Sequence, residues 1–227
     1  GVDAVASEQP VASARLRALF RLDEAPPTSA PEAHGDTVDG YHWHGFLQEA
    51  HLLADGLIGR AAELEKLKGW LKGRRGCADD EARIGWVPGA PGVGKSQLMA
   101  RIAADLDNGN ALATEQVRDT AVYYHRFRAG DARNSTRHFL RLLRAALDTW
   151  PRLAAAAPAG EAGADEGEAL VRDVRARLEA IATLEPANAQ APPPRLVVLL
   201  DGLDELARYD ASITGLLHRL AVPGTVW

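Results

Sequence analysis

The 227 residues are 46% apolar and 25% charged, a composition typical of one globular domain with a sizeable core. The net charge is −5 and no block of lysine or arginine exceeds two residues, which argues against a surface for nucleic acid or acidic membranes. Cys77 is the only cysteine, so an internal disulfide is excluded and a reducing compartment is expected. Apolar runs fall short of the roughly 20 residues that span a bilayer, so the sequence indicates a cytoplasmic protein without a membrane segment.

The first 40 residues divide into two predicted segments. Residues 1–23 contain an amphipathic helix at 11–22, VASARLRALFRL, in which Leu16, Leu19 and Phe20 share a face. This helix either packs on the main core or docks on a neighbouring domain, and both interpretations stay open. Residues 24–40 are rich in proline, alanine, glycine and acidic residues, which is typical of a linker.

The main domain is predicted to span residues 41–227 and to be incomplete on its C-terminal side. It opens with YHWH, where His42 and His44 could lie on one side of a strand, with His51 as the nearest further histidine. Aromatic packing is favoured over a metal site, because no cysteine or additional histidine follows at ligand spacing.

Strand-like and helix-like segments alternate from residue 82 onward. Apolar strands are predicted at 82–87, at 121–127, at 195–200 and from residue 225 to the end. Amphipathic helices are predicted with apolar faces over 98–106, 139–147 and 170–181, and a further helix over 205–220. The intervening stretches 154–168 and 186–194 are predicted loops. This alternation predicts an α/β fold with a central parallel sheet flanked by helices.

Residues 89 to 96, GAPGVGKS, match the phosphate-binding pattern G-x-x-x-x-G-K-[ST] between a predicted strand and a predicted helix. Glycines at this loop allow successive N–H groups to turn inward around a phosphate. Lys95 is expected to reach the β- and γ-phosphates, and Ser96 to bind Mg²⁺. The alternative is a glycine-rich turn with a chance lysine. The candidate nucleotide-binding residues of this Walker A motif are Gly89, Ala90, Pro91, Gly92, Val93, Gly94, Lys95, Ser96 and Gln97.

A phosphate loop needs an acidic residue at the end of a neighbouring strand, where it holds magnesium through its water shell. Asp201 follows the apolar run 195–200 and meets this requirement, as in a Walker B motif. Asp204 and Glu205 come next, where a carboxylate can orient or deprotonate the attacking water. Asp204 can instead cap a helix that starts near Glu205, so which of the two is catalytic stays open.

Three stretches resemble a known family. LVVLLDGLDEL, residues 196–206, resembles the Walker B element of NACHT-type NTPases, in which a small residue follows the magnesium aspartate and two acidic residues come after the next apolar one. LIGRAAELEKLKGWL, residues 57–71, is similar to the segment before the phosphate loop in signal-transduction ATPases with numerous domains (STAND) and in AAA+ proteins. Residues 123–147 are similar to the strand, Asp-x-Arg loop and helix of bacterial NACHT-like ATPases.

The resemblance covers residues 55–227 and implies a three-layer P-loop NTPase fold with ATP or ADP and Mg²⁺ as cofactors. It also implies that Ile58, Gly59 and Arg60 lie near the adenine and ribose. Family members continue with a polar sensor residue, a helical bundle and a winged helix, whereas this sequence ends at Trp227. We therefore expect this stretch to bind nucleotide and the full-length protein to hydrolyse it, with Lys95, Asp204 and Glu205 as candidate catalytic residues.

The expected function is a switch that exchanges ADP for ATP when a protein or ligand effector engages the full-length protein, which then forms homo-oligomers. A cycling AAA+-like motor is the first alternative. Such motors usually place glutamate directly after the magnesium aspartate, where Gly202 stands here. A DNA-binding transcriptional regulator with the same ATPase module is the second, although nothing basic in this stretch supports binding of nucleic acid. A non-hydrolysing interaction module is the third.

Overall fold

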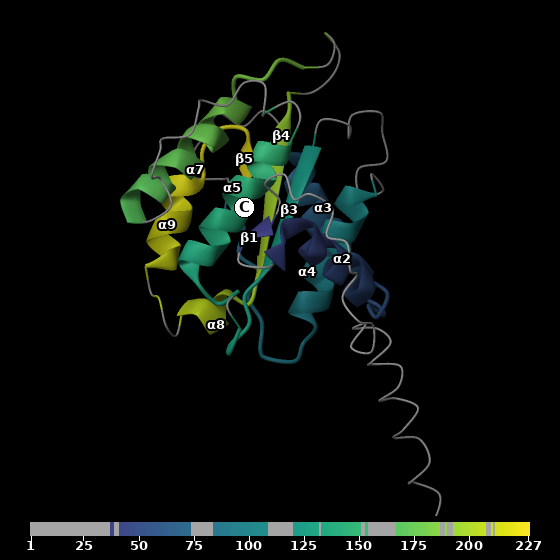
Figure 1. Ribbon diagram of the computed structural model, residues 1–227. Coiled ribbons are helices and arrows are strands. Elements are labelled where there is room, and N and C mark those ends of the chain that lie inside the picture. The colour runs from purple at the N-terminus through teal and green to yellow at the C-terminus, as the bar shows by residue number, and fades with distance from the viewer. Residues whose placement is uncertain are drawn as a thin grey trace, which may run out of the picture. The chain divides into compact units, whose positions relative to one another are not determined.

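The computed structural model in Figure 1 describes residues 37–38, 41–73, 84–108, 120–131, 133–150, 153, 167–186, 189, 193–207, 210 and 212–227. Contacts along the chain separate Gly1–Ala33 from His34–Trp227, and all the described residues lie in the second unit. The predicted helix at 11–22, most of the predicted linker 24–40, and Cys77 lie outside the described residues.

A parallel sheet forms the centre of the unit. Its strands are β3 (Thr120–Arg126), β4 (Arg195–Asp201) and β5 (Thr225–Val226), in the order β3-β4-β5. In β4, Leu196, Val197, Val198 and Leu199 are all buried, as expected for a strand with neighbours on both edges and helices on both faces. The α/β architecture predicted from the alternating pattern is therefore confirmed.

The segment predicted as a strand at 82–87 lacks regular strand geometry from residue 84 onward, while residues 82 and 83 lie outside the described part. The Gly85 N–H still donates a hydrogen bond to the Trp227 carbonyl at 2.8 Å, so this segment lies beside the end of β5. The Trp70 ring fills the space next to Gly85, where an added Cβ would lie 2.9 Å from it. A single such bond does not make a ladder, which explains the missing strand.

Three helices precede β3 in the described unit. They are α2 (Trp43–Ala54), α3 (Ala61–Gly73) and α4 (Lys95–Asp107), and α4 packs against α2, α3, β3 and β4. A short hairpin of β1 (Thr37–Val38) and β2 (Tyr41–His42) comes before them, so part of the predicted linker is a strand. Since α2 begins at Trp43, the expected strand carrying both His42 and His44 does not form.

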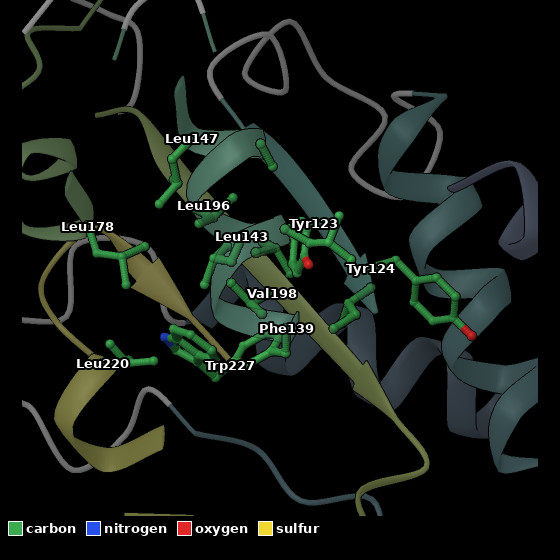
Figure 2. Packing of buried hydrophobic residues seen from close by; sticks show 14 of the residues in the cluster. Tyr123, Tyr124, Phe139, Leu143, Leu147, Leu178, Leu196, Val198, Leu220 and Trp227 are labelled. Carbon is green, nitrogen blue, oxygen red and sulfur yellow. The ribbon is translucent and has the colours of Figure 1, made fainter. Parts of the chain in front are cut away.

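Four further helices of the described residues follow β3 along the chain. They are α5 (Thr136–Thr149), α7 (Gly167–Ile181), α8 (Leu203–Ala207) and α9 (Ile213–Leu220), with α7 packed against α5 and α9. Figure 2 shows Phe139, Leu143 and Leu147 of α5 packed with Leu196 and Val198 of β4, while Tyr124 extends away from them. The apolar faces predicted for α4, α5 and α7 are confirmed as core.

Two predicted boundaries are wrong. The expected single helix over 205–220 is two helices, because Asp210 accepts hydrogen bonds from the backbone N–H and the hydroxyl of Ser212 and so forms a turn before α9. The predicted loop 154–168 ends earlier, since α7 already begins at Gly167. In the part of the chain that the structure describes, no helix combines the length and apolarity needed to cross a membrane.

Candidate nucleotide site

The GAPGVGKS loop leads directly into α4. Gly92 and Gly94 have φ values of 78° and 88°, a left-handed region that glycine enters without steric cost, and Gly94 is the N-cap of the helix. The Lys95 ammonium donates hydrogen bonds to the carbonyls of Gly89 at 2.7 Å and Ala90 at 3.0 Å. The cation is therefore folded over its own exposed loop, at the N-terminal end of α4.

The first turn of α4 meets the end of β4 through two side chains. The Ser96 hydroxyl donates a hydrogen bond to Asp201 Oδ1 at 3.0 Å, although the residues are 105 positions apart. Ser96 is in the first turn of a helix that packs on β4, and Asp201 is the last residue of that strand. The two residues predicted as magnesium ligands are thus brought together.

Asp201 is a buried carboxylate, and only one of its two oxygens accepts a hydrogen bond from the described residues. Among the described residues, Oδ2 accepts no hydrogen bond, and the closest cation is Arg126, whose Nε lies 3.3 Å away. Burial raises the pKa of Asp201, while the Ser96 hydrogen bond and the charge of Arg126 act in the opposite direction. A buried carboxylate oxygen without a donor beside a serine hydroxyl matches the hard oxygen ligands that Mg²⁺ prefers. These residues fit the ion that the Walker motifs imply.

Tyr124 is a third group at this carboxylate. Its hydroxyl is buried and has no hydrogen-bond partner within the described part of the chain. Burial and the nearby Asp201 charge both raise its pKa, so the phenol stays protonated. It therefore adds a neutral dipole, and no charge, to the surroundings of Asp201.

Gly202 turns the chain sharply after β4. Its φ is 76°, and a Cβ built at this position would lie 2.4 Å from the Phe127 carbonyl oxygen. The Phe127 N–H in turn donates to the Asp201 carbonyl at 2.9 Å, which ties the loop after β3 to the end of β4. A residue with a side chain cannot occupy position 202 unless these backbones separate.

Asp204 and Glu205 lie in the first turn of α8, which begins at Leu203. The helix starts earlier than expected, so Asp204 is inside it and is not its cap. The Glu205 carboxylate accepts a hydrogen bond from the Ala129 N–H in the loop after β3, and its carbonyl accepts one from Asn134. Asp204 is exposed, and its charge helps to raise the pKa of Asp201, which places it near the site. The two acids thus differ: Glu205 braces a loop and Asp204 faces solvent.

The segment Ile58–Arg60 lies beside the phosphate loop. The Arg60 guanidinium donates to the Val93 carbonyl at 2.6 Å and to Glu63 Oε1 at 2.7 Å. Gly59 and Arg60 both have positive φ, 76° and 63°, so the chain turns tightly here before α3. Ile58 is 93% exposed, which leaves an apolar surface next to the loop. In the first turn of α4, the Gln97 amide donates to the Gly56 carbonyl at 3.5 Å.

A comparison with known families matches residues 62–224, more than half of the chain, to the family described as Nephrocystin 3, N-terminal. The chain belongs to this family. The matched span contains the phosphate loop, the loop after β3 and the acidic residues after β4, and it begins just beyond Arg60. No curated protein and no solved structure gave a significant match.

This member of the nephrocystin 3 N-terminal family also contains an ionic network that our sequence reasoning missed. Arg126, at the end of β3, donates to Glu49 Oε1 of α2 at 2.9 Å, and Arg133 donates to Glu49 Oε2 at 3.0 Å. Arg133 also binds Asp131 through its backbone N–H and its Nε, at 2.9 and 2.7 Å. A charged residue at the carboxyl end of a predicted strand was the signal available for Arg126. No local pattern pointed to Glu49, because its partners lie more than 70 residues away.

Two of the described histidines of this family member make structural contacts. His125 is buried among the rings of Phe46, Phe127 and Phe139, and burial lowers its pKa to about 3, so it is neutral. Its Nε2 lies 3.2 Å from the Arg133 carbonyl. His51 pairs with Asp107 at 2.8 Å. In the described ranges no group of three or more His, Cys, Asp or Glu residues is placed to hold a metal ion.

Proposed function

We propose that this chain binds ATP or ADP with Mg²⁺ and is the nucleotide-switch core of a NACHT-like signalling ATPase with a P-loop NTPase fold. The observation that carries the proposal is the 3.0 Å hydrogen bond between Ser96 and Asp201. Two sequence motifs predicted separately to bind one magnesium ion are joined by that contact. The exposed glycine-rich loop and the helix N-terminus beside it support the same assignment.

Each residue has a definite task in the proposed site. The loop N–H groups would bind the phosphates, and Lys95 would exchange the carbonyls of Gly89 and Ala90 for phosphate oxygens. Ser96 and Asp201 would hold Mg²⁺, which when bound neutralises charge on the β- and γ-phosphates. The nucleoside would lie next to the exposed Ile58 and to Arg60, which donates a hydrogen bond to the Val93 carbonyl.

One of the two acids after Gly202 would orient or deprotonate the attacking water in the full-length protein. The exposed Asp204 is available for this task, whereas Glu205 would first have to release the Ala129 N–H. Such a contact suits a protein that hydrolyses slowly at rest and turns over when the loop after β3 moves.

The switch is favoured over a cycling motor by the packing of Gly202. A motor-type glutamate at this position would place its Cβ against the Phe127 carbonyl. Continuous fast turnover of the full-length protein without an effector would contradict the switch. An effector that triggers assembly into homo-oligomers, in the cytoplasm, completes the proposed role.

The decisive experiment for nucleotide binding is calorimetry with Lys95→Ala. Removing the ammonium should weaken ATP affinity about 100-fold or more, because the phosphates would lose a close charge partner. Lys66→Ala is the matched control, since Lys66 is an exposed lysine of α3. Unchanged ATP affinity in Lys95→Ala, with the folded state verified by circular dichroism, would remove the phosphate assignment.

A further inference from the structure

Arg126 occupies an unusual position between two carboxylates. The register of the parallel pair β3 and β4 sets Arg126 directly opposite Asp201, at the carboxyl ends of both strands. Its Nε lies 3.3 Å from Asp201 Oδ2, and its terminal NH1 donates to Glu49 Oε1 at 2.9 Å. The guanidinium of Arg126 therefore contacts two carboxylates at once, that of Asp201 and that of Glu49 in α2.

The two oxygens of Asp201 have different neighbours. Oδ1 accepts the neutral hydroxyl of Ser96, whereas Oδ2 faces the positive charge of Arg126 without a hydrogen bond from the described residues. The arginine therefore acts on Asp201 through its charge. A cation at this distance in a half-buried setting lowers the attraction of the carboxylate for a second cation by a substantial amount.

Glu49 holds this arginine from the other side. Arg126 and Arg133 approach opposite oxygens of Glu49, at 2.9 and 3.0 Å. The guanidinium of Arg126 is thus drawn towards α2, away from a closer approach to Asp201. Since α2 also packs against α4, which carries Ser96, the position of α2 bears on both magnesium ligands.

We propose that Arg126 is a positioning residue of the magnesium site. Its guanidinium neutralises Asp201 when Mg²⁺ is absent, and its hydrogen bond to Glu49 determines how strongly it competes with Mg²⁺ for that carboxylate. This inference rests on the proposed nucleotide function and adds a control to it. Loss of Arg126 makes Asp201 a stronger metal ligand. Loss of the Glu49 charge frees Arg126 to pair fully with Asp201, which makes Asp201 a weaker one.

The test measures how much Mg²⁺ tightens nucleotide binding in the full-length protein. Calorimetry gives the Kd of AMP-PNP, which is not hydrolysed, in excess EDTA and in excess Mg²⁺, and the ratio of the two Kd values is the Mg²⁺ effect. Arg126→Gln should raise this ratio about tenfold or more, because a positive charge next to Asp201 is gone. Arg126→Lys, which keeps a positive charge next to Asp201, should stay within about threefold of the wild type.

Glu49→Gln should lower the same ratio, so the two variants move it in opposite directions. Loss of packing alone would move it the same way in both. Arg128→Gln, an exposed arginine two positions along, is the control and should leave the ratio unchanged.

An unchanged or lowered ratio in Arg126→Gln would overturn the inference, as would a raised ratio in Glu49→Gln. If Arg126→Gln does not fold, Glu49→Gln and Arg126→Lys decide the matter by the same criteria. Failure of the wild type to bind AMP-PNP at all would overturn the nucleotide function and this inference with it. Wild-type binding with an unaltered ratio in Arg126→Gln would overturn only the role of Arg126.

Discussion

The Ser96 hydroxyl donates a hydrogen bond to Asp201 Oδ1 at 3.0 Å and so joins the first turn of α4 to the last residue of β4. A second neighbour, Arg126, faces the other oxygen of the same carboxylate at 3.3 Å. Asp201 therefore lies between the hydroxyl of Ser96 and the guanidinium of Arg126.

Ser96→Ala should abolish the tightening of nucleotide binding by Mg²⁺ while leaving Mg²⁺-free binding largely intact. In the proposed site this hydroxyl is a Mg²⁺ ligand, and its loss also removes the hydrogen bond to Asp201, worth about 1 kcal/mol of stability. Calorimetry in EDTA and in Mg²⁺ measures the first effect, and urea unfolding measures the second. Ser96→Thr keeps the hydroxyl and serves as control. A full Mg²⁺ effect in Ser96→Ala would show that Ser96 is not a ligand.

Gly202→Ala should destabilise the protein by about 2 kcal/mol or more, since positive φ strain adds to a Cβ placed 2.4 Å from the Phe127 carbonyl oxygen. Gly130→Ala is the matched control, because Gly130 has a φ of 78° but open space around an added Cβ. That control should cost only about 1 kcal/mol. Equal losses in the two variants, measured by urea unfolding, would mean that the contact with Phe127 is easily relieved.

Glu205→Ala and Asp204→Ala should separate the two acids. Glu205→Ala removes the acceptor of the exposed Ala129 N–H, which water can then reach, and should lower stability by about 0.5–1.5 kcal/mol. Asp204 is exposed, so Asp204→Ala should change stability by less than about 0.5 kcal/mol. In the full-length protein Asp204→Ala should nevertheless slow ATP turnover by about 10²–10⁴-fold, the usual contribution of a general base. Unaltered turnover would assign the water to another group.

His125→Phe should make the protein less sensitive to acid. The folded-state pKa of His125 is about 3, below its ordinary value of 6.5, so protons bind the unfolded chain first as the pH falls. The neutral histidine contributes stability above about pH 6.5, and this is lost towards pH 3 by about 1.4 kcal/mol per pH unit. Urea unfolding at pH 7 and pH 5 should show a smaller drop for His125→Phe than for the wild type. His218→Phe is the control, because His218 is exposed. Equal drops in the free energy of unfolding for all three proteins would contradict the lowered pKa of His125.

Much of the local structure could be predicted from the sequence because periodicity and glycine chemistry act over short distances. The apolar faces of α4, α5 and α7 and the run in β4 follow from residue spacing alone. The failures came where a tertiary contact or a turn competed with local propensity. A turn at Asp210 and Ser212 interrupts the helix that the pattern predicts as continuous, and the space next to Gly85 is filled by the ring of Trp70 from α3.

The candidate site shows the same division. By itself, the sequence determined the phosphate-loop pattern at 89–96, the acidic Asp201 at the end of an apolar run, and Gly202 after it. Each of these is visible in a short local run of residues. Only the tertiary structure decided that Ser96 meets Asp201, that Glu205 braces Ala129, and that Glu49 and Arg126 share a charge network. These contacts join residues between 76 and 105 positions apart. Sheet register and helix packing set such distances, and neither is written in a short stretch of sequence.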